Sequence, residues 1–290
     1  MTPSLKAHLQ LIRAPAVPTA VSNIVAAHLV AAQGELLWNE LLLLMVASAL
    51  LYMGGMVLND CFDAAEDARD RPQRPIPSGR IKLNYAWALG LGLLFAGAGF
   101  AAVAGPASAL VAGILAALIL LYNGYAKHTP AGPLVMGACR YGNWLLGLSP
   151  FALGSIGFAL ALPIFLYVTS LTILSRVETT ANDRRPLLFC GGGIVAVAAT
   201  IMGLWAMGWV FNSWALGLVA TGALLALSRL RMTWRDFTPA TVQKTVGTLV
   251  MGVIPLDAVM VFLAGPWWGG LLIASLWFPG RWLARFMSVS

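Results

Sequence analysis

The sequence predicts an all-α integral membrane protein, and its composition carries that prediction. Of its 290 residues, 59% are hydrophobic and only 10% are charged, and the mean hydropathy is +0.81. Apolar segments of about 20 residues, the length that crosses a bilayer as a helix, recur along the whole chain. A soluble globular domain has neither property, so we expect a single polytopic membrane domain over residues 1–290.

Ten apolar segments are candidates for membrane-spanning helices. They occupy residues 15–33, 37–58, 84–104, 106–122, 133–154, 157–175, 187–209, 212–229, 243–264 and 266–283. Nine of them approach the length of a full span, whereas the tenth is shorter and interrupted by proline. We therefore expect a bundle of nine to ten transmembrane helices.

Basic residues set the expected orientation of this bundle. Seventeen of the 18 Lys and Arg residues fall at the termini or in alternate loops, and such an excess marks the cytoplasmic side. We therefore expect both termini and the functional loops to be cytoplasmic. An even number of spans keeps Arg281 and Arg285 on the basic side, which favours ten spans over nine. Topology and anionic membrane lipid explain the net charge of +7, so we expect no nucleic-acid partner.

The densest polar stretch follows the second apolar segment. It carries five of the 11 acidic residues, and Asp60, Asp63 and Asp67 stand at i, i+3 and i+7, within an arc of about 60° on a helix. Three carboxylates so close repel one another unless a cation offsets them, and Mg²⁺ prefers carboxylate oxygens. The alternative is a solvated acidic loop paired with nearby basic residues: Arg69, Arg71 and Arg74.

Further polar residues lie on the same side of the membrane or within the spans. Tyr122 and Lys127 flank the point where the fourth segment meets the cytoplasm, although an interfacial aromatic beside a snorkelling lysine has the same pattern. Arg140 and Asn143 lie one turn apart in the fifth segment, where an arginine is costly unless it lines a polar cavity. Asp257, in the ninth segment, has no assigned role: it could relay protons or simply be satisfied by its surroundings.

Three motifs occur in a fixed order: Asn59-Asp60-x-x-Asp63-x-x-x-Asp67, then Arg74-Pro75-Ile76-Pro77-Ser78-Gly79-Arg80, then Tyr122-x-x-x-x-Lys127. In order and spacing they resemble the UbiA superfamily of intramembrane prenyltransferases, over most of the chain. The resemblance implies a U-shaped bundle of nine helices around a cavity on the cytoplasmic side, to which a tenth helix would be an addition. It also implies Mg²⁺-dependent transfer of a prenyl group from an isoprenyl diphosphate to a small or lipid acceptor.

The resemblance assigns expected roles to the polar residues. Asp60, Asp63 and Asp67 would hold Mg²⁺, and Asn59 would add or orient a ligand. The residues expected to bind phosphate oxygens are Arg74, Arg80, Lys127 and Arg140. Tyr122 and Asn143 complete the expected substrate-binding set, and the isoprenoid tail belongs among the apolar and aromatic residues of the bundle.

The second aspartate motif of the superfamily is altered here. After the sixth segment the chain reads Ser175-Arg176-Val177-Glu178-Thr179-Thr180-Ala181-Asn182-Asp183-Arg184-Arg185. Asp183 takes the last acidic position and would be a metal ligand, whereas Ser175 and Thr179 take the other two. Glu178 and Asn182, at i and i+4, are an alternative pair on one face, unless Glu178 merely pairs with a neighbouring arginine. This degeneration resembles the EboC-like branch of the superfamily.

Two other functions fit parts of the pattern. A membrane transporter would suit ten spans and the intramembrane carboxylate of Asp257, but it leaves the Arg-Pro-Ile-Pro-Ser-Gly turn unexplained. A CDP-alcohol phosphotransferase also uses spaced aspartates, but it requires Asp-Gly-x-x-Ala-Arg where Asp63 is followed by Ala64.

Overall fold

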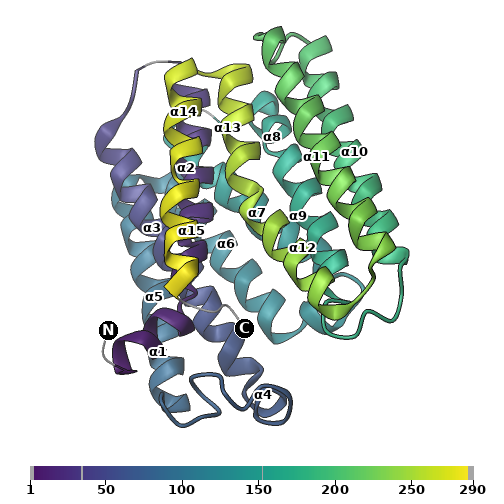
Figure 1. Ribbon diagram of the computed structural model, residues 1–290. Coiled ribbons are helices and arrows are strands. Elements are labelled where there is room, and N and C mark those ends of the chain that lie inside the picture. Colours follow the sequence, from purple (N-terminus) through teal and green to yellow (C-terminus); the bar gives the residue numbers. More distant parts are fainter. Residues whose placement is uncertain (1–2, 34, 152, 287–290) are drawn as a thin grey trace.

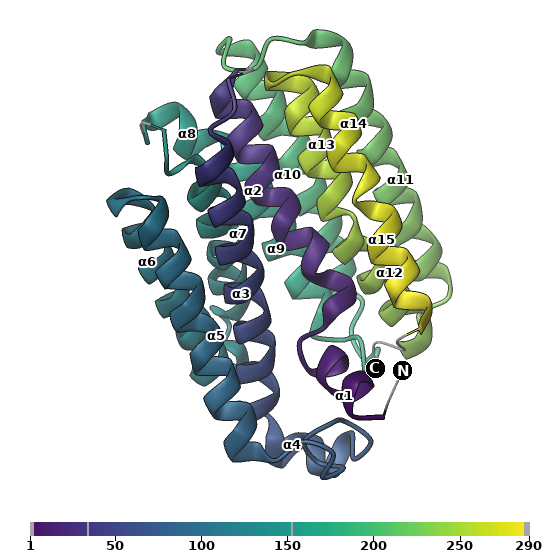
Figure 2. The same cartoon turned by 90° about the vertical axis from the view of Figure 1, so that its left-hand side faces the viewer.

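A computed structural model describes residues 3–33, 35–151 and 153–286. Every regular element in these residues is a helix, which confirms the predicted all-α class. Figures 1 and 2 show the long helices packed side by side in one bundle, with α1 (Pro3–Leu11) and α4 (Ala64–Asp70) at one end of it. The last helix, α15 (Trp277–Phe286), finishes at that same end (Figure 1).

Eight helical segments of the described residues are long and apolar enough to cross a membrane, and each coincides with a predicted segment. They are η1 with α2 (Ala14–Ala16, Val17–Ala32), α3 (Trp38–Phe62), α5 (Leu83–Ala104), α6 (Pro106–Gly124), α8 with α9 (Ser155–Leu160, Leu162–Ser175), α10 (Arg185–Ala206), η3 with α11 (Ser213–Ala215, Leu216–Arg235) and α12 with α13 (Pro239–Met251, Val253–Ala264). The chain is therefore an integral membrane protein.

The fifth and tenth predicted segments form shorter helices. The fifth is α7 (Gly132–Leu148), whose 17 residues include eleven buried ones, and it packs against α2, α6 and α9. A helix enclosed by neighbouring helices in this way buries most of its surface against protein. The tenth segment is divided at Leu276 into α14 (Trp267–Ser275) and α15. Whether these helices bring the number of crossings to nine or ten stays a prediction.

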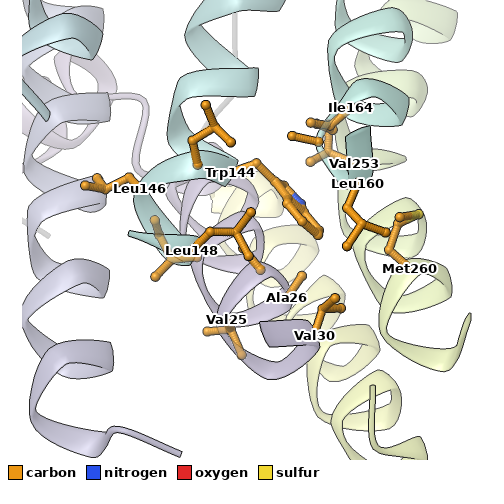
Figure 3. Packing of buried hydrophobic residues seen from close by; sticks show 14 of the residues in the cluster. Val25, Ala26, Val30, Trp144, Leu146, Leu148, Leu160, Ile164, Val253 and Met260 are labelled. Atoms are coloured by element: carbon orange, nitrogen blue, oxygen red, sulfur yellow. The ribbon is translucent and has the colours of Figure 1, made fainter. Parts of the chain in front are cut away.

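The main hydrophobic core lies where α2, α7, α9 and α13 meet. Figure 3 shows Trp144 of α7 within this cluster, beside Leu160 and Met260 and close to Ala26 of α2. The α2 and α7 backbones approach closely because Gly147 has no side chain: a Cβ there would lie 2.7 Å from the Cβ of Ala27. This contact sets the distance between the two helices that carry the polar network described below.

A break between α12 and α13 falls inside a membrane-spanning segment. Pro255 has no N–H to donate to the carbonyl of Met251, one turn earlier, and the helix is interrupted at Gly252. The carbonyl of Leu249, beside the break, accepts both the N–H of Gly252 at 3.0 Å and the Tyr167 hydroxyl of α9 at 2.8 Å. The break separates α12 from α13, the helix that carries Asp257.

Candidate active site

The carboxylate cluster spans the junction of two helices. α3 ends at Phe62 and α4 begins at Ala64, yet the N–H of Asp63 donates to the carbonyl of Asn59 (3.0 Å) and the N–H of Asp67 to that of Asp63 (2.8 Å). Helical spacing therefore continues through the junction, and the three aspartates keep one face. Their exposed fractions are only 5%, 7% and 3% for Asp60, Asp63 and Asp67, so they are not part of a solvated loop.

Cationic side chains lie directly against these carboxylates. Nη1 of Arg74 donates to Oδ2 of Asp67 at 2.7 Å and to Oδ1 of Asp60 at 3.5 Å, so one nitrogen bridges two carboxylates. Nη2 of Arg13 lies 3.4 Å from the same Asp60 oxygen, and Lys127 forms an ion pair with Asp63. The positive charge that the spacing demanded is supplied here by arginine and lysine.

The Arg-Pro-Ile-Pro-Ser-Gly segment is the turn that delivers Arg74. The Ser78 hydroxyl donates to the carbonyl of Arg74 at 2.6 Å, and Gly79 closes the turn with a φ of +74°, a conformation that glycine adopts readily. Arg80 braces the turn from outside, donating to the carbonyl of Gln73 and to the Ser78 hydroxyl. Arg80 is exposed and does not line the cavity described below, although it was expected to bind phosphate.

Asn59 connects the carboxylate helix to α6. Its amide donates to Oδ1 of Asn123 at 3.0 Å, and the Asn123 amide donates in turn to the carbonyl of Gly55 at 3.0 Å. This bridge holds the end of α6 beside α3. It places Tyr122 against the cavity, and it brings Lys127, in the turn η2 (Ala126–His128), to Asp63.

A cavity of about 920 Å³ opens beside the carboxylate cluster. Its charged lining residues are Arg13, Asp70, Arg71, Arg74, Arg140 and Glu178. Its apolar lining comes from several helices and includes Leu115, Ile119, Met136, Val168, Leu171, Val246 and Val250. A hollow with a cationic end and apolar walls suits an amphiphilic anion.

The altered second motif divides into two parts. Ser175, Glu178 and Thr179 line the cavity, whereas Asn182 and Asp183 are exposed and do not. Oδ1 of Asp183 instead accepts the backbone N–H of Arg185, the first residue of α10, at 2.9 Å. Glu178 has no ion pair with any described residue. Burial raises the pKa of its carboxyl group, and the nearby Arg71, Arg13 and Arg74 oppose that shift.

Arg140 and Asn143 belong to a polar network deeper in the bundle. Nη1 and Nη2 of Arg140 donate to the carbonyl and hydroxyl oxygens of Thr19, at 3.0 and 2.9 Å. The Asn143 amide donates to the carbonyl of Ala20 at 2.9 Å and accepts from the Ser48 hydroxyl at 2.7 Å. Both residues line the inner part of the cavity, so the arginine has the polar surroundings that it needs.

The donor set at the helix junction fits Mg²⁺. The oxygens of Asp60 and Asp67 converge on one point, where Arg74 now places a nitrogen, and hard carboxylate oxygens are the ligands that Mg²⁺ takes. A second group of ligand atoms, from Asp63, Glu66 and His128, lies within 4.8 Å of one another, but Glu66 and His128 are exposed. Asp63 is thus the buried member of this second group, next to the site formed by Asp60 and Asp67.

Several residues lie at the site although the sequence pattern did not predict them there. Arg13 counted there only as a topological charge, yet it adopts a left-handed backbone conformation (φ 49°) and reaches Asp60. Thr19, Asn23 and Tyr52 are polar residues isolated in apolar segments. Their partners lie far away along the chain, and no local spacing reveals them.

Comparison with known proteins gives consistent matches. The family model described as "UbiA prenyltransferase family" matches residues 20–188, more than half of the chain. Digeranylgeranylglyceryl phosphate synthase of Methanopyrus kandleri is 34% identical over 142 residues, which cover 49% of this chain and 52% of that protein. The Ignicoccus hospitalis protein of the same name is 30% identical over 192 residues, covering 62% and 59%. The chain thus spans about half the length of the curated relatives it matches.

Solved structures share the fold. A structure of digeranylgeranylglyceryl phosphate synthase has a TM-score of 0.67 at 23% identity, over 89% of this chain and 98% of that one. A UbiA homolog from Archaeoglobus fulgidus, bound to GPP and Mg²⁺, also has a TM-score of 0.67, at 12% identity, over 93% and 99%. At these identities the likeness shows the fold alone.

Proposed function

Because this chain belongs to the UbiA prenyltransferase family, we propose that it transfers a prenyl group from an isoprenyl diphosphate to an acceptor within the membrane. One observation carries the proposal. Three buried aspartates, two of them bridged by a single arginine nitrogen, lie beside a cavity with a cationic end and apolar walls. A diphosphate and a prenyl chain need these two environments side by side.

Asp60, Asp63 and Asp67 are the residues that would hold Mg²⁺. Bound there, Mg²⁺ would supply positive charge to the diphosphate as it leaves. Arg74 and Lys127, which now neutralise the carboxylates, are within reach to bind phosphate oxygens once the carboxylates have another partner. Arg71 and Arg13 line the same end of the cavity and add to its attraction for an anion.

The apolar part of the cavity suits the prenyl chain. Leu115, Ile119 and Val168 are among its lining residues, and they exclude water from the carbon that becomes cationic as the C–O bond breaks. The ring of Tyr122 lines the same space, and aromatic faces favour a cation.

The chemical class of the acceptor is inferred from the names of the relatives. The relatives are named digeranylgeranylglyceryl phosphate synthase, and their name describes a product with two geranylgeranyl groups on glyceryl phosphate. An acceptor of that class is one candidate for this chain. The chain's likeness to the EboC-like branch stays a prediction, as do the ligand roles of Glu178, Asn182 and Asp183.

The transporter hypothesis has no support. Asp257, its intramembrane carboxylate, is 0% exposed, does not line the cavity, and accepts hydrogen bonds from Ser22, Asn23 and Trp144. A carboxylate so enclosed has no path to an aqueous substrate. Membership of a prenyltransferase family likewise leaves the CDP-alcohol phosphotransferase hypothesis without a basis.

Turnover of a labelled isoprenyl diphosphate in nanodiscs tests the proposal. We expect activity that requires Mg²⁺, and a fall of about a hundredfold or more in kcat/KM for Asp60→Ala, Asp63→Ala or Asp67→Ala, because each removes a metal ligand. The exposed Asp236, whose carboxylate accepts from Thr241, provides the matched control as Asp236→Ala. Near-normal turnover in all three aspartate variants would refute the metal assignment.

A further inference from the structure

A partly buried arginine without a carboxylate partner lies at the inner end of the cavity. No ion pair among the described residues includes Arg140. Its guanidinium donates to Thr19 and, at 3.4 Å, to Oδ1 of Asn23, and it lies over the ring of Tyr52, 5.2 Å from the centroid. The hydrogen-bond acceptors of this guanidinium are all neutral oxygens, so an anion in the cavity that it lines would supply the countercharge.

The carboxylate linked to Arg140 is Asp257, and the Asn23 side-chain amide lies between the two. Oδ2 of Asp257 accepts from Nδ2 of Asn23 at 2.7 Å, while Oδ1 of the same Asn23 accepts from Arg140. The Asp257 carboxylate is also bound by the Ser22 hydroxyl at 2.6 Å and by the Trp144 indole at 3.1 Å; Figure 3 shows this indole within the packed core. Asp257 thus orients Arg140 through Asn23 without consuming its donors in a direct ion pair.

The residues of α3 that contact this part of the cavity lie further into the bundle than the aspartates. Tyr52, against which Arg140 stacks, precedes Asp60 by eight residues on α3, or about 12 Å along the helix axis. Ser48, which donates to Asn143, is four residues further from Asp60, about 18 Å in all. This offset along α3 gives a second ligand room beside Arg140 in the same cavity.

We propose that Arg140 forms a second anion subsite, which binds a phosphate or carboxylate group of the acceptor, and that Asp257 is its positioning residue, acting through Asn23. In naming the acceptor, the proposal rests on the proposed function. The subsite itself rests on the geometry of α2, α3, α7 and α13. The proposal assigns a role to the Asp257 carboxylate, which has none in the prenyl-transfer chemistry.

Calorimetry on the full-length protein in detergent tests the subsite. The probes are hexyl phosphate, its neutral counterpart hexanol, and geranyl thiodiphosphate with Mg²⁺ as a donor that does not react. We expect hexyl phosphate to bind when geranyl thiodiphosphate already saturates the protein, and Arg140→Gln to weaken that binding about tenfold or more while hexanol binding stays unchanged. Arg140→Lys, which keeps the charge, should restore part of the affinity. Arg231→Gln, an exposed arginine of α11, is the matched control.

The positioning role has its own variants. Asp257→Asn should weaken hexyl phosphate binding by about threefold or more with no effect on hexanol, a charge-specific loss that general disruption of packing would not give. If that variant does not fold, Asn23→Ser breaks the same link and leaves both charged residues in place. Wild-type affinity in either folded variant would overturn the role of Asp257.

The remaining outcomes separate the two proposals. Displacement of hexyl phosphate by geranyl thiodiphosphate, or unchanged affinity in Arg140→Gln, would place the anion at the aspartates and overturn the second subsite. Failure of geranyl thiodiphosphate to bind the wild-type protein with Mg²⁺ would instead count against the proposed function. In that case hexyl phosphate alone still tests Arg140.

Discussion

At the scale of single residues, Arg74 forms ion pairs with two carboxylates of the cluster. Its Nη1 bridges Asp60 and Asp67, and the side chain is only 7% exposed. We propose that Mg²⁺ bound at the same point would compete with Arg74 for these oxygens. Arg74 would then be available to the diphosphate, which would link binding of the metal to binding of the donor.

Replacing Arg74 separates these two effects. Arg74→Gln should strengthen binding of Mg²⁺ alone, because a competing cation is gone, and should lower kcat/KM for the prenyl donor by about tenfold or more, because a charge-assisted contact to phosphate is lost. Calorimetric titration with Mg²⁺ and donor kinetics measure the two. Arg69→Gln, an exposed arginine of α4, is the control. Weaker Mg²⁺ binding in Arg74→Gln would show that Arg74 does not compete with the metal.

The sequence identified residues whose partners are set by local spacing. Asp60, Asp63 and Asp67 share a face because helical periodicity puts them there. Arg13 and Asn23 could not be found in this way, because their partners lie 47 and 234 residues away along the chain and only tertiary packing joins them. Arg80 and Asp183 were expected to bind substrate and metal, and these roles stay predictions. In the structure Arg80 donates within the turn, and Oδ1 of Asp183 accepts the N–H of Arg185.

At the scale of elements, helix ends decide which residues of the altered motif reach the cavity. α9 ends at Ser175, and the chain runs through Glu178 and Thr179 along the cavity wall before α10 begins at Arg185. The predicted segments located these helices to within a few residues. The break at Gly252 and the junction at Asp63 were not anticipated, because each interrupts a segment that is apolar or periodic on both sides.

Restoring carboxylates at the motif tests its role. Ser175 and Thr179 both line the cavity, so the double change Ser175→Asp with Thr179→Asp adds two oxygen donors there. We expect the affinity for Mg²⁺ to rise by about tenfold, since carboxylates dominate its coordination. The control is Ser175→Asn with Thr179→Asn, which has similar size and no charge. Equal Mg²⁺ affinity in both double variants would mean that this wall takes no part in metal binding.

At the scale of the whole molecule, the carboxylate cluster and the Lys- and Arg-rich turn that follows it lie at one end of the bundle. α1, α4 and the end of α15 lie together there (Figures 1 and 2), and the carboxylate cluster is at the junction of α3 with α4. By the excess of Lys and Arg in these loops, we propose that this end faces the cytoplasm.

A single cysteine tests the proposed orientation. Ser78 is exposed in the turn after α4, and the native cysteines Cys61, Cys139 and Cys190 are all buried, so labelling of Ser78→Cys should stand out against the background. We expect a membrane-impermeant maleimide to label it only after the cells are opened. Trp214→Cys, at an exposed position of η3 on the opposite side of a span, should be labelled in intact cells. The reverse pattern would invert the topology.

The central claim is that the buried aspartates make this chain a prenyltransferase, and its most direct test is mass spectrometry of membrane lipids from a host that expresses it. We predict a species heavier than its precursor by one prenyl group in cells with the wild-type chain, which disappears when Asp63→Ala is expressed at the same level and persists with Asp236→Ala. Identical lipid profiles for the wild-type chain and Asp63→Ala, with a prenylated species present in both, would contradict the account.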